Sequence, residues 1–270
     1  MITESRNPRS MHLSELSAEE IVRLMNEEDA AVLSAVRACI PAIAETAELY
    51  AKVLSENGRV FYLGAGTSGG IAMLDAAEIP PTFGFPEGRV IALSAEDGIR
   101  YLSDDEDNTH KAEEQLSRYH CGADDLVIGI AASGSTPYVA EGLRYARSIG
   151  ASTAGIVCNR DSVIKTIAGI TIEAVCGPEV LTGSTRLKAG TAQKMILNML
   201  STAAMVRLGK VRSNFMVDVR PMNAKLVKRA LSIIREVTGC DEATAEQALR
   251  ESGNDTRAAV DRILRSGKTF

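Results

Sequence analysis

Two glycine-rich turns that carry several hydroxyl side chains are the parts of this sequence best suited to chemistry. The first, residues 64–69, follows the apolar run 60–63, and the second, residues 133–136, follows the apolar run 126–130. Where a buried strand leads through such a turn into a helix, free backbone N–H groups, the positive end of the helix dipole and the hydroxyl donors face one small volume. The pattern predicts an anion site, best suited to phosphate, with these candidate residues: Gly66, Thr67, Ser68, Gly69, Ser133, Gly134, Ser135 and Thr136.

The first turn also has the G-x-G-x-x-G spacing of a dinucleotide-binding loop. That motif expects an acidic residue at the end of the second strand, whereas the run 90–93 ends in Ser94. Thr67 and Ser68 are also unusual in a loop that holds a pyrophosphate mainly through its backbone. Glycine turns capped by hydroxyls can serve tight strand-to-helix connections alone. Two such turns in one sheet favour a site for a single phosphate group.

Carboxylates suited to proton transfer lie in two places. Glu78 falls in the last turn of a predicted helix, 69–78, which Pro80 and Pro81 are expected to end. A carboxylate at the negative end of a helix is disfavoured as an anion, which suits a general acid, although an exposed surface glutamate is the common alternative. The acidic run 104–107 is typical of a solvated turn, but clustered like charges can also provide a base.

A third hydroxyl-rich segment, residues 179–191, precedes another predicted helix. Its side chains Ser184, Thr185 and Lys188 are further candidates for binding an anionic substrate. The alternative for Lys188, and for Arg186 beside it, is an ion pair with a nearby carboxylate.

The composition excludes several classes of protein. The 270 residues carry a net charge of -5, no Trp and only 4% aromatic residues, which argues against a nucleic-acid surface. Five scattered cysteines without C-x-x-C spacing suggest neither disulfides nor a metal site. No apolar run approaches the about eighteen residues of a membrane span, and the first residues lack an apolar signal core. We therefore expect a cytoplasmic protein without membrane partners.

The chain between the turns predicts an α/β fold. Five apolar runs without alternation indicate strands buried on both faces, at residues 60–63, 90–93, 126–130, 153–157 and 170–174. Helices are expected at 69–78, 96–118, 137–148 and 160–166, and from Ala189 onward. Repeated strand–helix units predict a doubly wound, five-stranded parallel sheet with right-handed crossovers.

Helical segments flank this core. Residues 1–18 read as an arm; Ser17 and Glu20 form a capping-box pattern that starts a helix, and a longer amphipathic helix is expected at 29–54. Three short capped helices, 224–238, 241–251 and 255–264, form a C-terminal appendage. The predicted division is 1–57 for the N-terminal arm and helices packing on the core, 58–222 for the α/β domain, and 223–270 for the three-helix domain.

Segments spread over most of the chain resemble the N-acetylmuramic acid 6-phosphate etherases of the sugar isomerase (SIS) superfamily. The matching segments are Thr3-Glu4-Ser5-Arg6-Asn7-Pro8 and residues 63–69, 78–84, 129–134, 136–138, 182–194, 198–202 and 214–219. The SIS glycine loops are widely shared, whereas the segments around Glu78 and Gly183 are specific to the etherases. Gly70 stands where these proteins usually have Arg.

This resemblance implies a cytoplasmic homodimer that removes D-lactate from N-acetylmuramic acid 6-phosphate in cell-wall sugar recycling, with no metal or redox cofactor. The product would be N-acetylglucosamine 6-phosphate. A base takes the C2 proton of the open-chain aldehyde, an acid protonates the departing ether oxygen at C3, and water then adds. The resemblance assigns the acid to Glu78 and the base to Glu106, with Asp105 and Asp107 as alternatives. The SIS domain, 58–222, would hold the 6-phosphate in its hydroxyl-rich loops, with the site near the dimer interface.

Two other functions on the same scaffold stay open. A non-catalytic sugar-phosphate sensor, similar to the glucokinase regulatory proteins, would need no carboxylate pair. A SIS aldose–ketose isomerase would transfer only the C2 proton, which leaves a leaving-group acid without a role.

Overall fold

The structure is a computed structural model that describes residues 1–96, 104–219, 221 and 223–266. The chain divides into two compact units. The first comprises Met1–Ala76 and Gly88–Ala204, and the second comprises Ala77–Glu87 and Met205–Phe270.

A five-stranded, fully parallel sheet forms the centre of the first unit. Its strands are β1 (Val60–Gly64), β2 (Val90–Ser94), β3 (Leu126–Ala131), β4 (Ser152–Val157) and β5 (Ile170–Glu173), in the order β2-β1-β3-β4-β5. The predicted strands and the doubly wound class are therefore confirmed. Strands β1 and β3 are buried throughout, whereas the edge strands β2 and β5 are only partly buried. The strand order reverses between β1 and β3, so the turns that follow these two strands are neighbours at the carboxyl edge.

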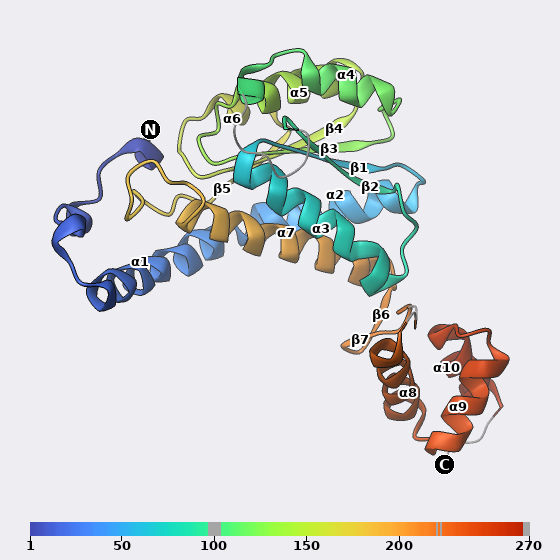
Figure 1. The fold of residues 1–270 in the computed structure, drawn as a ribbon. Coiled ribbons are helices and arrows are strands. Elements are labelled where there is room, and N and C mark those ends of the chain that lie inside the picture. The colour runs from blue at the N-terminus through green and yellow to red at the C-terminus, as the bar shows by residue number, and fades with distance from the viewer. Residues whose placement is uncertain (97–103, 220, 222, 267–270) are drawn as a thin grey trace. The chain divides into compact units, whose positions relative to one another are not determined.

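Helices cover both faces of the sheet (Figure 1). One face carries α4 (Lys111–Arg118), α5 (Pro137–Ser148) and α6 (Val163–Ile167). The other carries α2 (Ile40–Ser55), the first part of α3 (Gly66–Phe83), and α7 (Lys188–Arg207). A large core cluster lies between the sheet and α5, where Leu63, Val127 and Leu143 are fully buried. Short 3-10 turns lie at Ile2–Glu4, Pro8–Ser10, Leu13–Glu15 and Asp104–Asp107.

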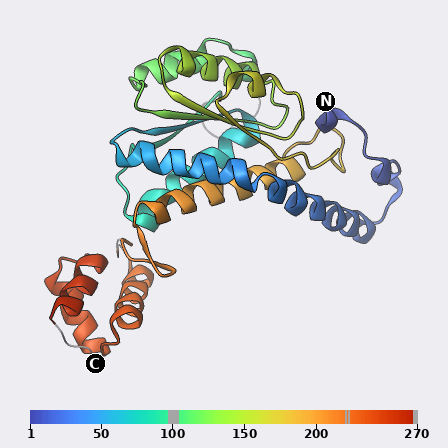
Figure 2. The same cartoon turned by 180° about the vertical axis from the view of Figure 1, so that it is seen from behind.

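The expected long helix at 29–54 is wrong, because the chain forms two helices there. Helix α1 runs over Ala18–Ala38 and starts with the predicted capping box of Ser17 and Glu20, and α2 follows after Cys39 at an angle of 60°. Pro41 explains the break, since it has no N–H and its ring would clash with the carbonyl of Arg37 in a continuous helix. Figure 2 shows the two helices end to end. Within the described residues no single helix has the length and apolar character to cross a membrane; only this bent pair, taken together, reaches that threshold.

Two other predicted helices also differ. Helix α3 begins at Gly66 and continues through Pro80 and Pro81 to Phe83, so Glu78 does not lie in its last turn. The helix expected at 96–118 is wrong in its described part, where a 3-10 turn, Asp104–Asp107, precedes α4. Residues 97–103 of that prediction lie outside the described residues.

A buried hydrogen-bond chain fixes α3 against the sheet. The Tyr50 and Tyr62 hydroxyl oxygens are 3.0 Å apart, and Tyr62 donates to Asp75 on α3 at 3.0 Å. Ser201 on α7 donates to the other Asp75 oxygen at 3.0 Å. Because buried polar groups are costly unless paired, these hydrogen bonds specify one position for the start of α3.

The second unit contains the three predicted C-terminal helices. A hairpin of β6 (Val211–Arg212) and β7 (Phe215–Met216) precedes α8 (Ala224–Thr238), α9 (Glu242–Glu251) and α10 (Thr256–Arg265). The caps are Asn223, Asp241 and Asp255, each of which accepts a hydrogen bond from the first turn of its helix. Small apolar residues such as Ala230, Ala245 and Ala259 let the helices approach closely.

Candidate functional site

A cavity of about 360 Å³ lies in the first unit at the carboxyl edge of the sheet. It brings together residues from both glycine turns, the acidic segment, the 179–191 segment and the N-terminal arm. Its polar lining residues are Thr67, Ser68, Ser133, Ser135, Thr136, Thr185, Glu4, Glu106 and Asp107. Gly66 also lines the cavity, whereas Gly69, Gly134, Ser184, Lys188 and Glu78 are not among its lining residues.

The donors of the first turn are largely used within the protein. The Gly66 N–H donates to both carboxylate oxygens of Glu96, at 3.0 Å each, and Ser94 donates to the same carboxylate at 2.8 Å. Ser68 is buried and donates to Gln193 on α7 at 2.9 Å. Gly69 permits the close return of the chain, because a Cβ there would lie 2.5 Å from Ser94 Oγ. Of the candidate residues in the first turn, Thr67 is therefore the main one left to bind an anion.

The second turn leaves more of its donors to the cavity. Ser133 Oγ accepts from the Ser135 N–H at 3.2 Å and lies 3.4 Å from Thr136 Oγ1. Gly134 has φ +70°, and a Cβ there would lie 2.3 Å from Ser162 Cβ, so only glycine fits. Pro137 then opens α5, whose N-terminus faces the turn. Hydroxyls and the positive end of a helix make this turn the better phosphate cradle.

The acidic segment places Glu106 and Asp107 on the cavity wall, and both side chains are exposed. Partial burial raises the pKa of Glu106, and the negative charges of Asp107 and Glu96 raise it further. A carboxyl group with a raised pKa is a stronger base once it is ionised. Asp105 instead pairs with Lys111 at 3.2 Å, whereas Glu106 and Asp107 line the cavity.

Two sequence-derived candidates lie elsewhere. The Lys188 ammonium is buried and pairs with Glu28 of α1 at 2.7 Å, which is the alternative that the sequence left open. Glu179 accepts the Lys188 and Ala189 N–H groups at 3.0 and 2.9 Å and so caps α7. Glu78 is exposed on the part of α3 that belongs to the second unit.

Sequence reasoning missed two carboxylates near the cavity. Glu4 comes from the N-terminal arm, and Glu96 follows β2 in a position too late for a dinucleotide motif. The only signal for Glu4 is its place in the Thr3–Pro8 segment of the family resemblance, and no pattern assigned it a role.

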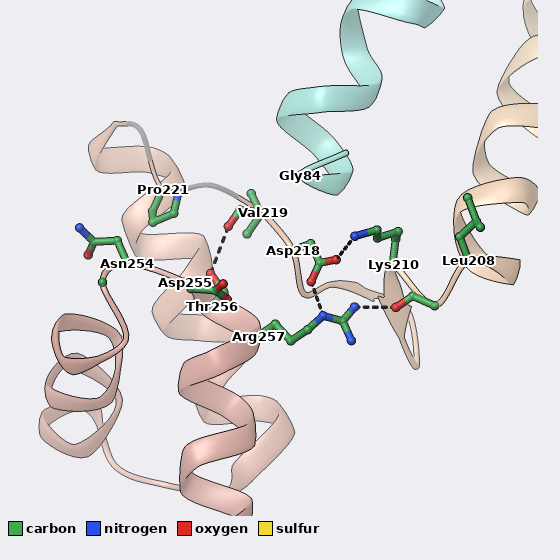
Figure 3. Close-up of a pocket in the computed structure, with 12 residues that line it drawn as sticks. Gly84, Leu208, Lys210, Asp218, Val219, Pro221, Asn254, Asp255, Thr256 and Arg257 are labelled. Carbon is green, nitrogen blue, oxygen red and sulfur yellow. Dashed lines mark hydrogen bonds and ion pairs between the residues drawn. The ribbon is translucent and has the colours of Figure 1, made fainter. Parts of the chain in front are cut away.

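A larger cavity, about 670 Å³, lies within the second unit (Figure 3). Asp218 stands at its centre and forms ion pairs with Lys210, at 2.9 Å, and with Arg257. Arg257 also donates to the Gly209 carbonyl, and Thr256 to the Val219 carbonyl. These charges satisfy one another, which indicates a structural link between the hairpin and α10 rather than a second ligand site.

Family models match three stretches of the chain. Residues 42–147 match the glucokinase regulatory protein N-terminal SIS domain, and residues 107–203 match the SIS domain. Residues 213–266 match the C-terminal lid domain of glucokinase regulatory protein. The parallel sheet of the first unit is thus a SIS fold.

Curated relatives decide the family. The N-acetylmuramic acid 6-phosphate etherase 2 of Bacillus licheniformis is 51% identical over 98% of this chain and 90% of its own length. The etherase of Yersinia pestis is 48% identical over 98% of this chain and 91% of its own length. This chain belongs to the N-acetylmuramic acid 6-phosphate etherase family. The resemblance drawn from the sequence is confirmed, and the etherase family is one of carbon–oxygen lyases.

Solved structures share the fold of this etherase-family chain. An E. coli CFT073 protein superposes with a TM-score of 0.55 at 18% identity, covering 74% of this chain and 97% of that one. The Vibrio vulnificus NanR protein complexed with ManNAc-6P gives 0.54 at 16% identity, covering 72% and 66%. At these identities the likeness establishes the fold alone.

Proposed function

We propose that this chain cleaves the D-lactyl ether of N-acetylmuramic acid 6-phosphate to give N-acetylglucosamine 6-phosphate and D-lactate. The observation that carries the proposal is the 51% identity to a named etherase over 98% of the chain. The cavity supports it, because a hydroxyl-rich turn and the carboxylates of Glu106 and Asp107 line the same cavity. The fold relative solved with ManNAc-6P favours a sugar phosphate as the ligand class.

The proposed division of labour combines the cavity with the family resemblance. Ser133, Ser135 and Thr136 hold the 6-phosphate, which orients the open-chain sugar from a point remote from the reacting carbons. Glu106 takes the C2 proton as the base, and its raised pKa suits that task. Glu78, which the resemblance assigns, is the proposed acid that protonates the ether oxygen at C3. The elimination and the addition of water change no overall oxidation state, so the proposed reaction uses no redox cofactor.

The direct test is incubation of the purified chain with N-acetylmuramic acid 6-phosphate, followed by measurement of D-lactate. We expect lactate and N-acetylglucosamine 6-phosphate in equal amounts. A well-folded chain that binds the sugar phosphate and releases no lactate would contradict the proposal.

That negative result would favour a sugar-phosphate sensor. One observation supports this alternative. Both matched glucokinase regulatory protein domains belong, by their names, to a regulator. Release of no lactate but exchange of the C2 proton would instead favour a phosphosugar isomerase.

We further propose that the chain works as a cytoplasmic homodimer with its site near the interface. Val22 and Leu33 are 61% and 59% exposed and lie eleven residues apart on α1, so they share one face of the helix. Two exposed apolar side chains on one helix face offer apolar surface that a second copy of the chain can cover. Light scattering on the wild type and on Leu33→Asp tests this, with a dimer expected for the first and a monomer for the second.

A further inference from the structure

The N-terminal arm is fixed to the turn that we assign to phosphate. The side-chain oxygen of Asn159 accepts from the Ile2 N–H at 2.7 Å and from the Thr3 N–H at 3.3 Å. Its amide nitrogen donates to Thr3 Oγ1 at 2.9 Å and to the carbonyls of Ala132 and Ser133, at 3.1 and 3.3 Å. Asn159 and Thr3 are each 2% exposed. One buried amide therefore joins the arm to the start of the second glycine turn.

A second anchor holds the arm four residues beyond Thr3. Asn7 is buried and donates to Glu28 at 2.7 Å and to the Pro178 carbonyl at 3.2 Å. Glu28 is the residue that pairs with Lys188. The arm is thus tied on one side to α1 and on the other to the segment before α7 (Figure 1).

Glu4 lies between these anchors and lines the cavity together with Ser133, Ser135 and Thr185. The neighbouring chain leaves room for its carboxylate. Gly183 has φ +76°, and a Cβ at this position would lie 3.1 Å from Glu4 Oε2. The anchors on both sides restrict where the Glu4 carboxylate can lie.

An ionised carboxylate only accepts hydrogen bonds. It repels a phosphate group and a substrate carboxylate, so it discriminates in favour of neutral donors such as hydroxyl or amide N–H groups. We propose that Glu4 is a specificity-determining residue that accepts a hydrogen bond from a hydroxyl or amide N–H of the sugar chain while the phosphate lies in the second turn. This inference rests on the sugar-phosphate substrate of the proposed function.

Binding to two probes tests the assignment. We expect Glu4→Ala to weaken the affinity for N-acetylglucosamine 6-phosphate about tenfold by calorimetry, the usual effect of losing a hydrogen bond to a charged group. Its affinity for inorganic phosphate should not fall, because the second turn is unchanged and the substitution removes a negative charge that repels phosphate. Glu15→Gln, an exposed glutamate of the same arm, is the matched control and should leave both affinities unchanged.

Two results would overturn the role of Glu4. One is an unchanged affinity of Glu4→Ala for the amino sugar phosphate, and the other is an equal loss for both probes, which would indicate a loosened arm. Thr3→Val, which removes the acceptor for Asn159, separates arm position from the carboxylate, since it loosens the arm with Glu4 intact and should lower the affinity for both probes. The role of Glu4 is tested by binding and the proposed function by D-lactate release. A wild type that releases no D-lactate therefore refutes the proposed function without deciding the role of Glu4.

Discussion

Both carboxylate oxygens of Glu96 lie 3.0 Å from the backbone nitrogen of Gly66, at the first residue of α3. The protein thereby places its own negative charge at the positive end of a helix where the sequence predicts a ligand anion. An incoming phosphate would have to displace a buried carboxylate there. Among the described residues, no carboxylate occupies the second glycine turn in this way, which favours residues 133–136 as the proposed phosphate site.

The two turns should therefore differ in mutagenesis. We expect Ser133→Ala to raise KM for N-acetylmuramic acid 6-phosphate about tenfold, because a hydrogen bond to a charged group contributes about 1.5–3 kcal/mol. Ser68→Ala should change KM less, because the Ser68 hydroxyl already donates to Gln193. Steady-state kinetics of the two variants compares them directly, and a larger KM effect at Ser68 would place the phosphate in the first turn instead.

Glu96 should also set the pH dependence of the reaction. Burial, Asp107 and Glu96 raise the pKa of Glu106, and a base works only when ionised, so activity rises with pH through that pKa. Glu96→Gln removes one negative charge but keeps an acceptor for the Gly66 N–H. The acid limb of kcat/KM against pH should then move to lower pH.

The matched control is Glu87→Gln, an exposed glutamate of the second unit that should leave the limb in place. A limb that stays fixed or moves upward in Glu96→Gln would exclude electrostatic coupling between Glu96 and the base.

Separating proton removal from departure of lactate tests the acid and the base. Glu78→Gln should reduce lactate release by about 10²–10⁴-fold yet still exchange the C2 proton with deuterium from solvent. Glu106→Gln should lose both. NMR of the substrate in heavy water measures the exchange, with Glu113→Gln on the exposed side of α4 as a control. Normal exchange in Glu106→Gln would transfer the base role to Asp107.

Asp218 should make the stability of the second unit depend on pH. Burial opposes its ionisation, but the hydrogen bonds from Arg257 and Lys210 outweigh it and lower the pKa of Asp218 below its ordinary 3.8. A lowered pKa contributes stability above the unfolded value, and this stability is lost as pH falls through the folded value. Asp218→Asn should cost about 1–3 kcal/mol in the free energy of unfolding near neutral pH.

Urea denaturation from about pH 7 to below 3.8 measures this effect, and the difference between Asp218→Asn and the wild type should shrink once the pH falls below 3.8. The exposed pair of Asp261 and Arg212, 3.7 Å apart, supplies the control Asp261→Asn, for which almost no change is expected. A difference for Asp218→Asn that is independent of pH would contradict the ion-pair explanation.

The sequence predicted those elements that are formed by residues close together in the chain. Continuous apolar runs identified the five strands, because a strand in a parallel sheet is buried on both faces. Side-chain caps identified the C-terminal helices, since Asn223, Asp241 and Asp255 satisfy N–H groups only three residues away. The two glycine turns were found because strand, turn and helix are contiguous in the chain.

Proline effects were predicted less well, since a proline does not dictate one outcome. Pro41 coincides with the break between α1 and α2, whereas α3 accommodates Pro80 and Pro81 and continues to Phe83. The packing around each helix decides whether a lost backbone hydrogen bond ends it. For that reason the sequence predicted Glu78 in the last turn of its helix, whereas α3 continues past Glu78 to Phe83.

Contacts between distant residues were decided only by the tertiary structure. Lys188 pairs with Glu28, 160 residues away, and Asn159 holds Thr3, 156 residues away. The sequence determined which groups are candidates for phosphate binding and proton transfer, and in which elements they lie. The fold decided which of them face the cavity, because burial and pairing depend on neighbours that only the folded chain brings together.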